Sequence, residues 1–232
     1  PHKVTALALG GSVGTDGKPL EAEVVRFATL DALKAAKPGS LDGKIAYVAY
    51  RMERHKDGHG YGKAVGARVA GTSIAAEKGA VAFLLRSVGT DDNRLAHTGV
   101  MQYEENIKRI PAVAISNPDA DLLDNMLTRD EPVMFSLNTS ASGPTGRVAT
   151  IANVIGDVTG SEHPEEVVTL GAHLDSWDVG TGAIDDGIGI GITLATGHYI
   201  AELPQRPART VRVILFAAEE IGLYGAKDYV VQ

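Results

Sequence analysis

The chain alternates short, almost wholly apolar runs with stretches of helical pattern, and this alternation limits the folds open to it. The clearest apolar runs are Ala80–Arg86 and Thr210–Ala217, and helical patterns cover Ala64–Lys78 and Gly187–Leu203. Each apolar run has the length of a strand, and continuous apolar character is typical of strands that are covered on both faces. We therefore expect an α/β protein with buried strands, in which Thr210–Ala217 pairs in parallel.

Composition narrows the classes of partner and of chemistry. Of the 232 residues, 44% are hydrophobic and 22% are charged, as in ordinary globular proteins. The 22 Lys and Arg residues are outnumbered by 29 Asp and Glu residues, so we expect neither nucleic acid nor a membrane surface as a partner. The chain has no cysteine, which excludes disulfides, thiolate metal sites and cysteine nucleophiles. Any metal must therefore be held by His, Asp or Glu side chains.

The stretch NTSASGPTG at residues 138–146 is the best candidate for a domain boundary, because it is small, polar and contains both Gly and Pro. Before it, residues 43–86 have the pattern of a strand–helix–strand unit. We expect three parts: a leading segment at residues 1–28, a first domain at residues 29–142 and a second domain at residues 143–232.

Metal-capable side chains follow the two strongest strands of the second domain. His173 and Asp175 come directly after one strand, and Glu219 and Glu220 come directly after Thr210–Ala217. In an open α/β sheet, ligands bind in the crevice outside the carboxyl ends of the strands. The sequence therefore predicts that these side chains converge on one site.

These residue types suit a pair of metal ions that activate water. His173 offers an imidazole nitrogen, and Asp175, on the same side of an extended chain, can accept the hydrogen of the other ring nitrogen. Asp185 lies between the two strands in the sequence and is short enough to bridge two cations. Neighbouring residues of an extended strand diverge, so we expect Glu219 and Glu220 to differ in role, one as a ligand and one moving protons.

Other residues admit interpretations that we consider weaker. Ser176 lies close to the predicted histidine and aspartate, but the chain has no GxSxG motif to support a serine-hydrolase hypothesis. His55, His59 and His97 could form an accessory metal site, although exposed histidines are usually only polar surface. Trp177, the only tryptophan, either shapes a substrate pocket or merely packs.

The segments GAHLDSWDVGTGAIDDGIGIG and ILFAAEEIGLYGAKDY together resemble the co-catalytic dizinc metallopeptidases, a family of aminopeptidases and carboxypeptidase Q-like enzymes. The resemblance implies a partial zinc-exopeptidase (phosphorylase/hydrolase-like) mixed sheet with helices on both faces, and two Zn²⁺ ions. It implies that His173 binds one zinc, that Glu220 binds the other and that Asp185 bridges both. It further implies that Glu219 is the general base, that Asp175 orients the histidine, and that the peptide bond after Asp185 is cis.

The segment at residues 60–99 is similar to the α+β protease-associated domain that is inserted in carboxypeptidase Q-like members of the family. The resemblance implies that residues 29–142 are this insert, that residues 1–28 lead into it from the peptidase domain, and that residues 143–232 are the N-terminal half of the peptidase domain. The resemblance implies hydrolysis of short peptides, above all dipeptides, by an exported protein (periplasmic or extracellular) that could form a homodimer. The family completes its site with a further Asp and a further His beyond the EE motif, which this chain does not contain. We therefore expect an internal fragment that is weakly active or inactive alone.

The alternative function is that of a non-catalytic, peptidase-like binding or receptor module. Loss of metal ligands would mark such a protein. Every ligand position of the family that falls inside this chain holds the family's residue type, which favours the metallopeptidase. An unrelated flavodoxin-like binding protein is a more remote hypothesis.

Overall fold

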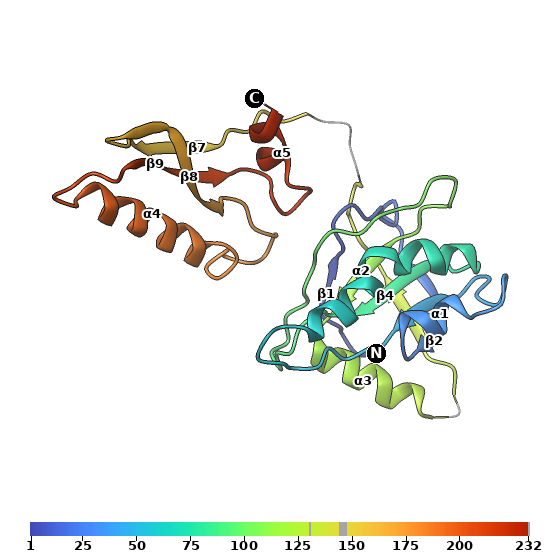
Figure 1. The fold of residues 1–232 in the computed structure, drawn as a ribbon. Helices are drawn as coiled ribbons and strands as arrows, with labels where there is room; N and C mark the ends of the chain where they lie inside the picture. The colour runs from blue at the N-terminus through green and yellow to red at the C-terminus, as the bar shows by residue number, and fades with distance from the viewer. Residues whose placement is uncertain (130, 144–147, 232) are drawn as a thin grey trace. The chain divides into compact units, whose positions relative to one another are not determined.

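The computed structural model describes residues 1–129, 131–143 and 148–231 (Figure 1). The chain divides into two compact units, Pro1–Gly146 and Arg147–Gln232, which are the N-terminal and the C-terminal unit below. The predicted linker at residues 138–146 ends at this division, and its residues 144–146 lie outside the described part. None of the helices in the described ranges is long and apolar enough to cross a bilayer.

The N-terminal unit is built on a six-stranded mixed sheet. Its strands are β1 (Ala6–Ala8), β2 (Leu20–Phe27), β3 (Ile45–Val48), β4 (Ala82–Arg86), β5 (Ala112–Ile115) and β6 (Met134–Leu137), and its helices are α1 (Leu30–Lys34), α2 (Gly60–Glu77) and α3 (Asn117–Leu127). The strand order is β1-β5-β4-β3-β2-β6. The four central strands are parallel, whereas β1 and β6 pair antiparallel at the two edges.

Apolar side chains pack against both faces of this sheet. Phe83 of β4 belongs to a core cluster with residues of α1 and α2, and the next residue, Leu84, belongs to a second cluster with residues of α3. Helix α2 lies close to the strands, because a Cβ atom at Gly71 would come within 2.4 Å of the Phe83 ring. The predicted strand–helix–strand unit is therefore present as β3, α2 and β4, with β3 and β4 parallel.

Residues 1–28, which the sequence sets apart as a leading segment, contribute β1 and β2 to the sheet of this unit. Strand β2 pairs with β3 on one side and with β6 on the other. Buried backbone N–H and C=O groups need hydrogen-bond partners, and the two neighbouring strands supply them along both edges of β2. That residues 29–142 form a protease-associated domain stays a prediction.

The C-terminal unit contains a three-stranded sheet and two helices. The elements are β7 (Val154–Val158), β8 (His163–His173), α4 (Gly187–Ala201), β9 (Arg209–Phe216) and α5 (Tyr224–Val231). Strand β9 is central, with β7 antiparallel on one side and β8 parallel on the other. The parallel pairing predicted for Thr210–Ala217 is therefore confirmed.

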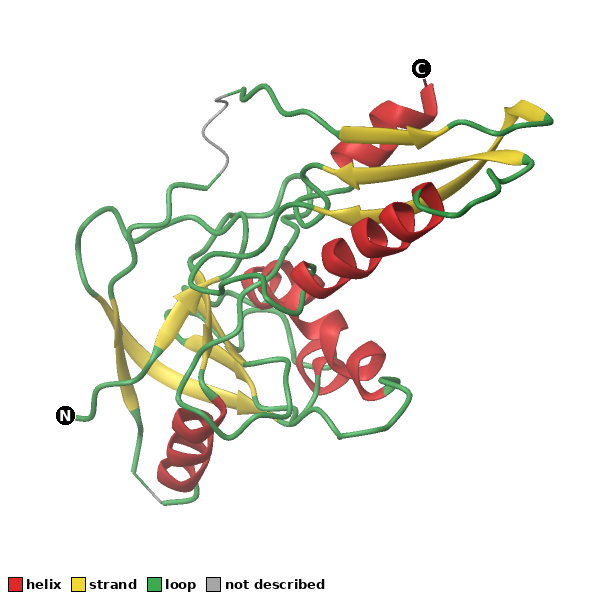
Figure 2. Ribbon diagram, turned by 90° about the vertical axis from the view of Figure 1, so that its left-hand side faces the viewer, coloured by secondary structure: helices red, strands yellow, loops and turns green. Residues whose placement is uncertain are grey.

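Helices lie on both faces of this second sheet (Figure 2). Helix α4 packs closely on β9, because a Cβ atom at Gly197 would come within 2.5 Å of Val213. The ring of Phe216 packs edge-on against Tyr229 of α5, with 6.1 Å between ring centroids. Since residues 213 and 216 are an odd number of positions apart, they point to opposite faces of the strand. The predicted mixed α/β sheet with helices on both faces is confirmed.

A cross-strand ion pair joins β7 to β9. Asp157 lies opposite Arg212, and both carboxylate oxygens of Asp157 accept hydrogen bonds from the guanidinium, at 2.7 Å each. Hydrogen bonding to Arg212 lowers the pKa of Asp157 below its ordinary value. An aspartate with a lowered folded-state pKa contributes stability above its unfolded pKa of about 4 and loses it as the pH falls through the folded value.

Replacement of Asp157 by asparagine is therefore expected to lower the free energy of unfolding by about 0.5–1 kcal/mol at pH 7, the range of a partly exposed ion pair. The difference between the variant and the wild type should shrink below about pH 4, because the wild-type carboxylate is then protonated. Urea unfolding of both proteins at pH 7 and at pH 3 measures this difference in the free energy of unfolding. An equal difference at both pH values would contradict the electrostatic origin.

Candidate active site

Strands β8 and β9 end side by side, and the predicted site residues lie at this edge of the sheet. The two strands are parallel, and His173 at the end of β8 is in register with Phe216 at the end of β9. The chain after each strand therefore leaves the sheet at the same place. Glu219 follows β9 closely, and its Oε2 lies 4.0 Å from Nε2 of His173.

Asp175 joins the two chain segments that leave the sheet. Its Oδ1 accepts the backbone N–H of Glu219 at 2.8 Å, and its Oδ2 accepts the backbone N–H of Glu220 at 3.0 Å. Ala218, directly before these residues, has a φ of 53°, in the left-handed region that non-glycine residues seldom adopt. The turn at Ala218 therefore aims two consecutive amides at one carboxylate.

The orientation of His173 differs from the one expected from the sequence. The sequence predicts that the Asp175 carboxylate accepts the ring N–H, but that role belongs to the Asp175 backbone carbonyl, 2.9 Å from Nδ1. The carboxylate oxygen Oδ1 is farther away, at 3.7 Å. The physical reason is that the two amides of the β9 loop already engage the carboxylate. With Nδ1 donating to a carbonyl, the lone pair of the neutral ring is on Nε2.

Two neighbouring aspartates approach His173 from the loop before α4. Oδ1 of Asp185 lies 3.0 Å from Nε2 of His173, and the Asp185–Asp186 peptide bond is cis, as the family resemblance implies. Oδ2 of Asp186 accepts the backbone N–H of His173 at 2.9 Å. A Cβ atom at Gly189 would lie 2.0 Å from the Asp186 carboxylate, so this glycine leaves room for it. The sequence reasoning gave Asp186 no role, and its place beside Asp185 was the available signal.

Glu219 and Glu220 lie in different surroundings. Glu219 approaches the ring of His173. Glu220 borders a cavity of about 330 Å³ whose lining includes Trp177, Leu174 and Ile221. The two neighbouring carboxylates are thus positioned for different roles, and Trp177 lines a cavity next to one of them.

The charges of the site act on two of its groups. Burial alone would lower the pKa of His173, but the hydrogen bond to the Asp175 carbonyl and the charges of Glu219 and Asp186 outweigh it and raise that pKa. Burial raises the pKa of Glu220, and the negative charges of Asp185 and Glu219 add to the effect. The site therefore crowds several carboxylates around one imidazole, an arrangement that a bound cation would stabilise.

The donor set fits zinc. Imidazole nitrogen and carboxylate oxygen are ordinary zinc ligands, and Nε2 of His173 is the ring nitrogen that carries the lone pair. The ligand atoms of His173, Asp185 and Glu220 do not all lie within 4.8 Å of one another. In the described part of the chain, a different group of three side chains meets that limit.

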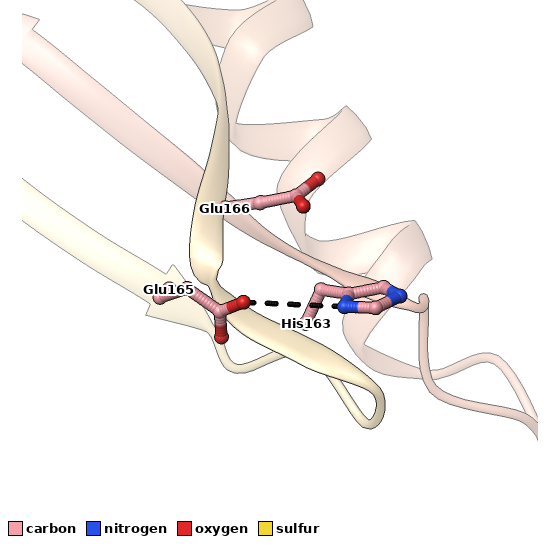
Figure 3. Close-up of side chains that lie close together, drawn as sticks. All are labelled: His163, Glu165 and Glu166. Carbon is pink, nitrogen blue, oxygen red and sulfur yellow. Dashed lines mark ion pairs between the residues drawn. The ribbon is translucent and has the colours of Figure 1, made fainter.

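The group that does meet the limit lies at the other end of β8. It consists of His163, Glu165 and Glu166, all exposed (Figure 3). His163 pairs with Glu165 at 3.9 Å, and Glu166 forms an ion pair with Arg209. Exposed acidic groups of this kind are common without a metal, and the sequence reasoning did not select them.

The histidines considered for an accessory metal site are each paired with a carboxylate. The rings of His55 and His59 stack with 3.7 Å between centroids. His59 contacts Asp57 at 2.6 Å, and His97 contacts Asp91 at 2.9 Å. Within the residues that the structure describes, these histidines belong to no group of three close metal-capable side chains.

Comparison with known proteins matches both the sequence and the fold. Residues 153–232 match the Peptidase family M28. The chain is 38% identical over 228 residues to carboxypeptidase Q of Mus musculus, which covers 98% of this chain and 47% of that protein, and 36% identical to the Homo sapiens protein over the same length. A crystal structure of a peptidase M28 precursor from Shewanella amazonensis has a TM-score of 0.95 and 52% identity, covering 99% of this chain and 52% of that one.

The fold also resembles that of a zinc aminopeptidase from Bacillus subtilis, with a TM-score of 0.58 at 22% identity and with 100% of this chain and 50% of that one covered. At this identity the similarity concerns the fold alone. Fold and sequence together define a peptidase-type α/β protein. The chain contains a peptidase M28 domain at residues 153–232 and is homologous to carboxypeptidase Q. It spans about half the length of the curated relatives it matches.

Proposed function

We propose that the protein carrying this chain is a metal-dependent exopeptidase that hydrolyses short peptides, dipeptides above all. One observation carries the proposal: Nε2 of His173, the ring nitrogen that does not contact the Asp175 carbonyl, lies 3.0 Å from Asp185 and 4.0 Å from Glu219, at the joined carboxyl ends of β8 and β9. This is the place where α/β sheets bind ligands. The homology to carboxypeptidase Q supports the same class of reaction.

The residues that would hold zinc are His173 for one ion, Glu220 for a second and Asp185 for both. Bound zinc supplies positive charge that polarises a peptide carbonyl and acidifies water. The family likeness and the mixed imidazole and carboxylate donors support two ions. Asp175 acts indirectly, since its carboxylate holds the amides of Glu219 and Glu220 while its carbonyl orients the histidine.

Proton transfer falls to Glu219. Its carboxylate takes the proton of the attacking water and passes it to the amine that leaves when the peptide bond breaks. Glu220 instead borders the cavity lined by Trp177 and Ile221, whereas Glu219 lies 4.0 Å from the His173 ring, and the family likeness makes Glu220 the ligand of the second ion. The division of roles between the two residues therefore follows from their surroundings.

The substrate class follows from the charges around the site. The carboxylate of Glu219, which binds no metal in this proposal, favours an ammonium group nearby, as a free amino terminus provides. The cavity beside Glu220 has an apolar lining that includes Trp177 and Ile221, which suits an apolar substrate side chain. Short peptides with a free terminus and an apolar residue meet both conditions.

The test is an assay of the full-length protein with zinc on Ala-Leu and on the same dipeptide with its amino terminus acetylated. We expect hydrolysis of the free dipeptide and at least a tenfold loss of kcat/KM on acetylation, because the ammonium charge is removed. Elemental analysis of the same preparation should find about two zinc ions for each chain. A protein that binds peptides without cleaving any would instead be a non-catalytic binding module.

A further inference from the structure

The loop that carries Glu219 and Glu220 is closed at its base by one side chain from another strand. The loop runs from Ala217, after β9, to Gly225, in the first turn of α5. Both end residues are buried. The backbone N–H of Gly225 donates to the carbonyl of Ala217 at 2.9 Å, so the two ends of the loop meet.

Asn153, directly before β7, completes this contact with both halves of its side-chain amide. Its Oδ1 accepts the backbone N–H of Ala217 at 3.0 Å, and its Nδ2 donates to the carbonyl of Gly225 at 2.8 Å. Together with the bond between Gly225 and Ala217, this forms a ring of three hydrogen bonds. A Cβ atom at Gly225 would lie 2.3 Å from Oδ1 of Asn153 and 2.5 Å from the Ala217 carbonyl, so the glycine permits the close approach.

The chemistry of the ring requires an amide. One planar group must accept a hydrogen at one atom and donate a hydrogen at the other, and asparagine does both. Aspartate has the same shape and keeps the acceptor for Ala217, but it places an oxygen against the Gly225 carbonyl. The loop is thus held at two places: at its base by Asn153 and, beyond the turn at Ala218, by Asp175.

We propose that Asn153 is a positioning residue for Glu219 and Glu220. This rests on the proposed function, in which Glu219 moves a proton and Glu220 binds a metal. Asn153 touches neither carboxylate and acts through the backbone at the two ends of their loop. When the hydrogen bond from Asn153 to the Gly225 carbonyl is lost, the loop shifts relative to His173. Small displacements of a catalytic group lower the rate strongly.

The experiment compares three variants in the full-length, zinc-loaded protein: Asn153→Asp, the milder Asn153→Ser, and the control Asp157→Asn. The control weakens the same pair of strands, since Asp157 joins β7 to Arg212 of β9, but it leaves the loop untouched. We expect Asn153→Asp to lower kcat about 10–100-fold with KM changed less than threefold, and Asn153→Ser to lower kcat by a smaller factor. The control should keep kcat within twofold of wild type.

Hydrogen exchange at the amides of Glu219 and Glu220 is the second measurement. Loosening of the loop should speed their exchange at least tenfold in Asn153→Asp and not in Asp157→Asn. Unchanged kcat in the folded Asn153 variants overturns the proposal, and so does an equal loss in the control, which would indicate general destabilisation. If Asn153→Asp fails to fold, the kcat of Asn153→Ser tests the proposal instead. An inactive wild-type protein would overturn the proposed function instead, and the exchange rates alone would then decide about Asn153.

Discussion

Replacement of Glu219 by glutamine is expected to lower turnover about 10²–10⁴-fold, the usual effect of removing a general base. Glutamine has nearly the same shape but cannot take a proton from water. The backbone N–H of residue 219 still donates to Asp175, so the loop should keep its place. Steady-state hydrolysis of a dipeptide and elemental analysis on the same preparation measure both effects, and the metal content should not change.

A matched control for this variant is Glu162→Gln, which removes a carboxylate from an exposed position before β8. Its turnover should stay within twofold of wild type. Two results would contradict the assignment of Glu219. Normal turnover in Glu219→Gln would exclude a role as base, and loss of metal in that variant would make Glu219 a ligand instead.

Removal of the metal is expected to abolish peptidase activity, with at least a hundredfold loss after dialysis against a chelator and recovery on addition of zinc. The reason is that no side chain of the site can replace the positive charge that a metal places on the peptide carbonyl. The prediction also distinguishes two locations for the metal. His173→Ala should lower both the zinc content and the activity, because Nε2 of His173 faces the carboxylates of Asp185 and Glu219.

The matched control is His163→Ala, which alters the exposed group at the opposite end of β8. We expect the zinc content and the activity of this variant to equal those of wild type. Loss of zinc in His163→Ala with retention in His173→Ala would show that the metal binds at the exposed group. Full activity in protein that elemental analysis finds free of metal would exclude metal-dependent hydrolysis altogether.

The elements of the C-terminal unit could be predicted from local sequence. Thr210–Ala217 is apolar at nearly every position, and it forms the central strand β9, covered by helices on both faces. A continuously apolar strand is typical of parallel sheets, whose strands are buried on both faces, so the parallel pairing with β8 could also be predicted. The parallel pairing then brings the residues after β8 close to those after β9, so the approach of His173 to Glu219 was within reach of the sequence.

Partners of individual hydrogen bonds could not be predicted in this way. Residues 1–28 have strand patterns that fit either a separate segment or the first sheet, and only the pairing of β2 with both β3 and β6 decides between them. The carboxylate of Asp175 was assigned to the nearby histidine because the two residues are close in sequence. Its real partners are the amides of Glu219 and Glu220, which the turn at Ala218 aims towards it.

The sequence by itself determined which metal-binding side chains the site can offer, since the chain lacks cysteine and carries His173, Asp185, Glu219 and Glu220 after or between apolar strands. Residue type and strand pattern are local properties, and both can be identified from the sequence alone. Only the tertiary structure decided how these groups are held. The hydrogen bonds of Asn153 join residues that are distant in sequence, and they depend on where a turn places a backbone amide, which no local pattern encodes.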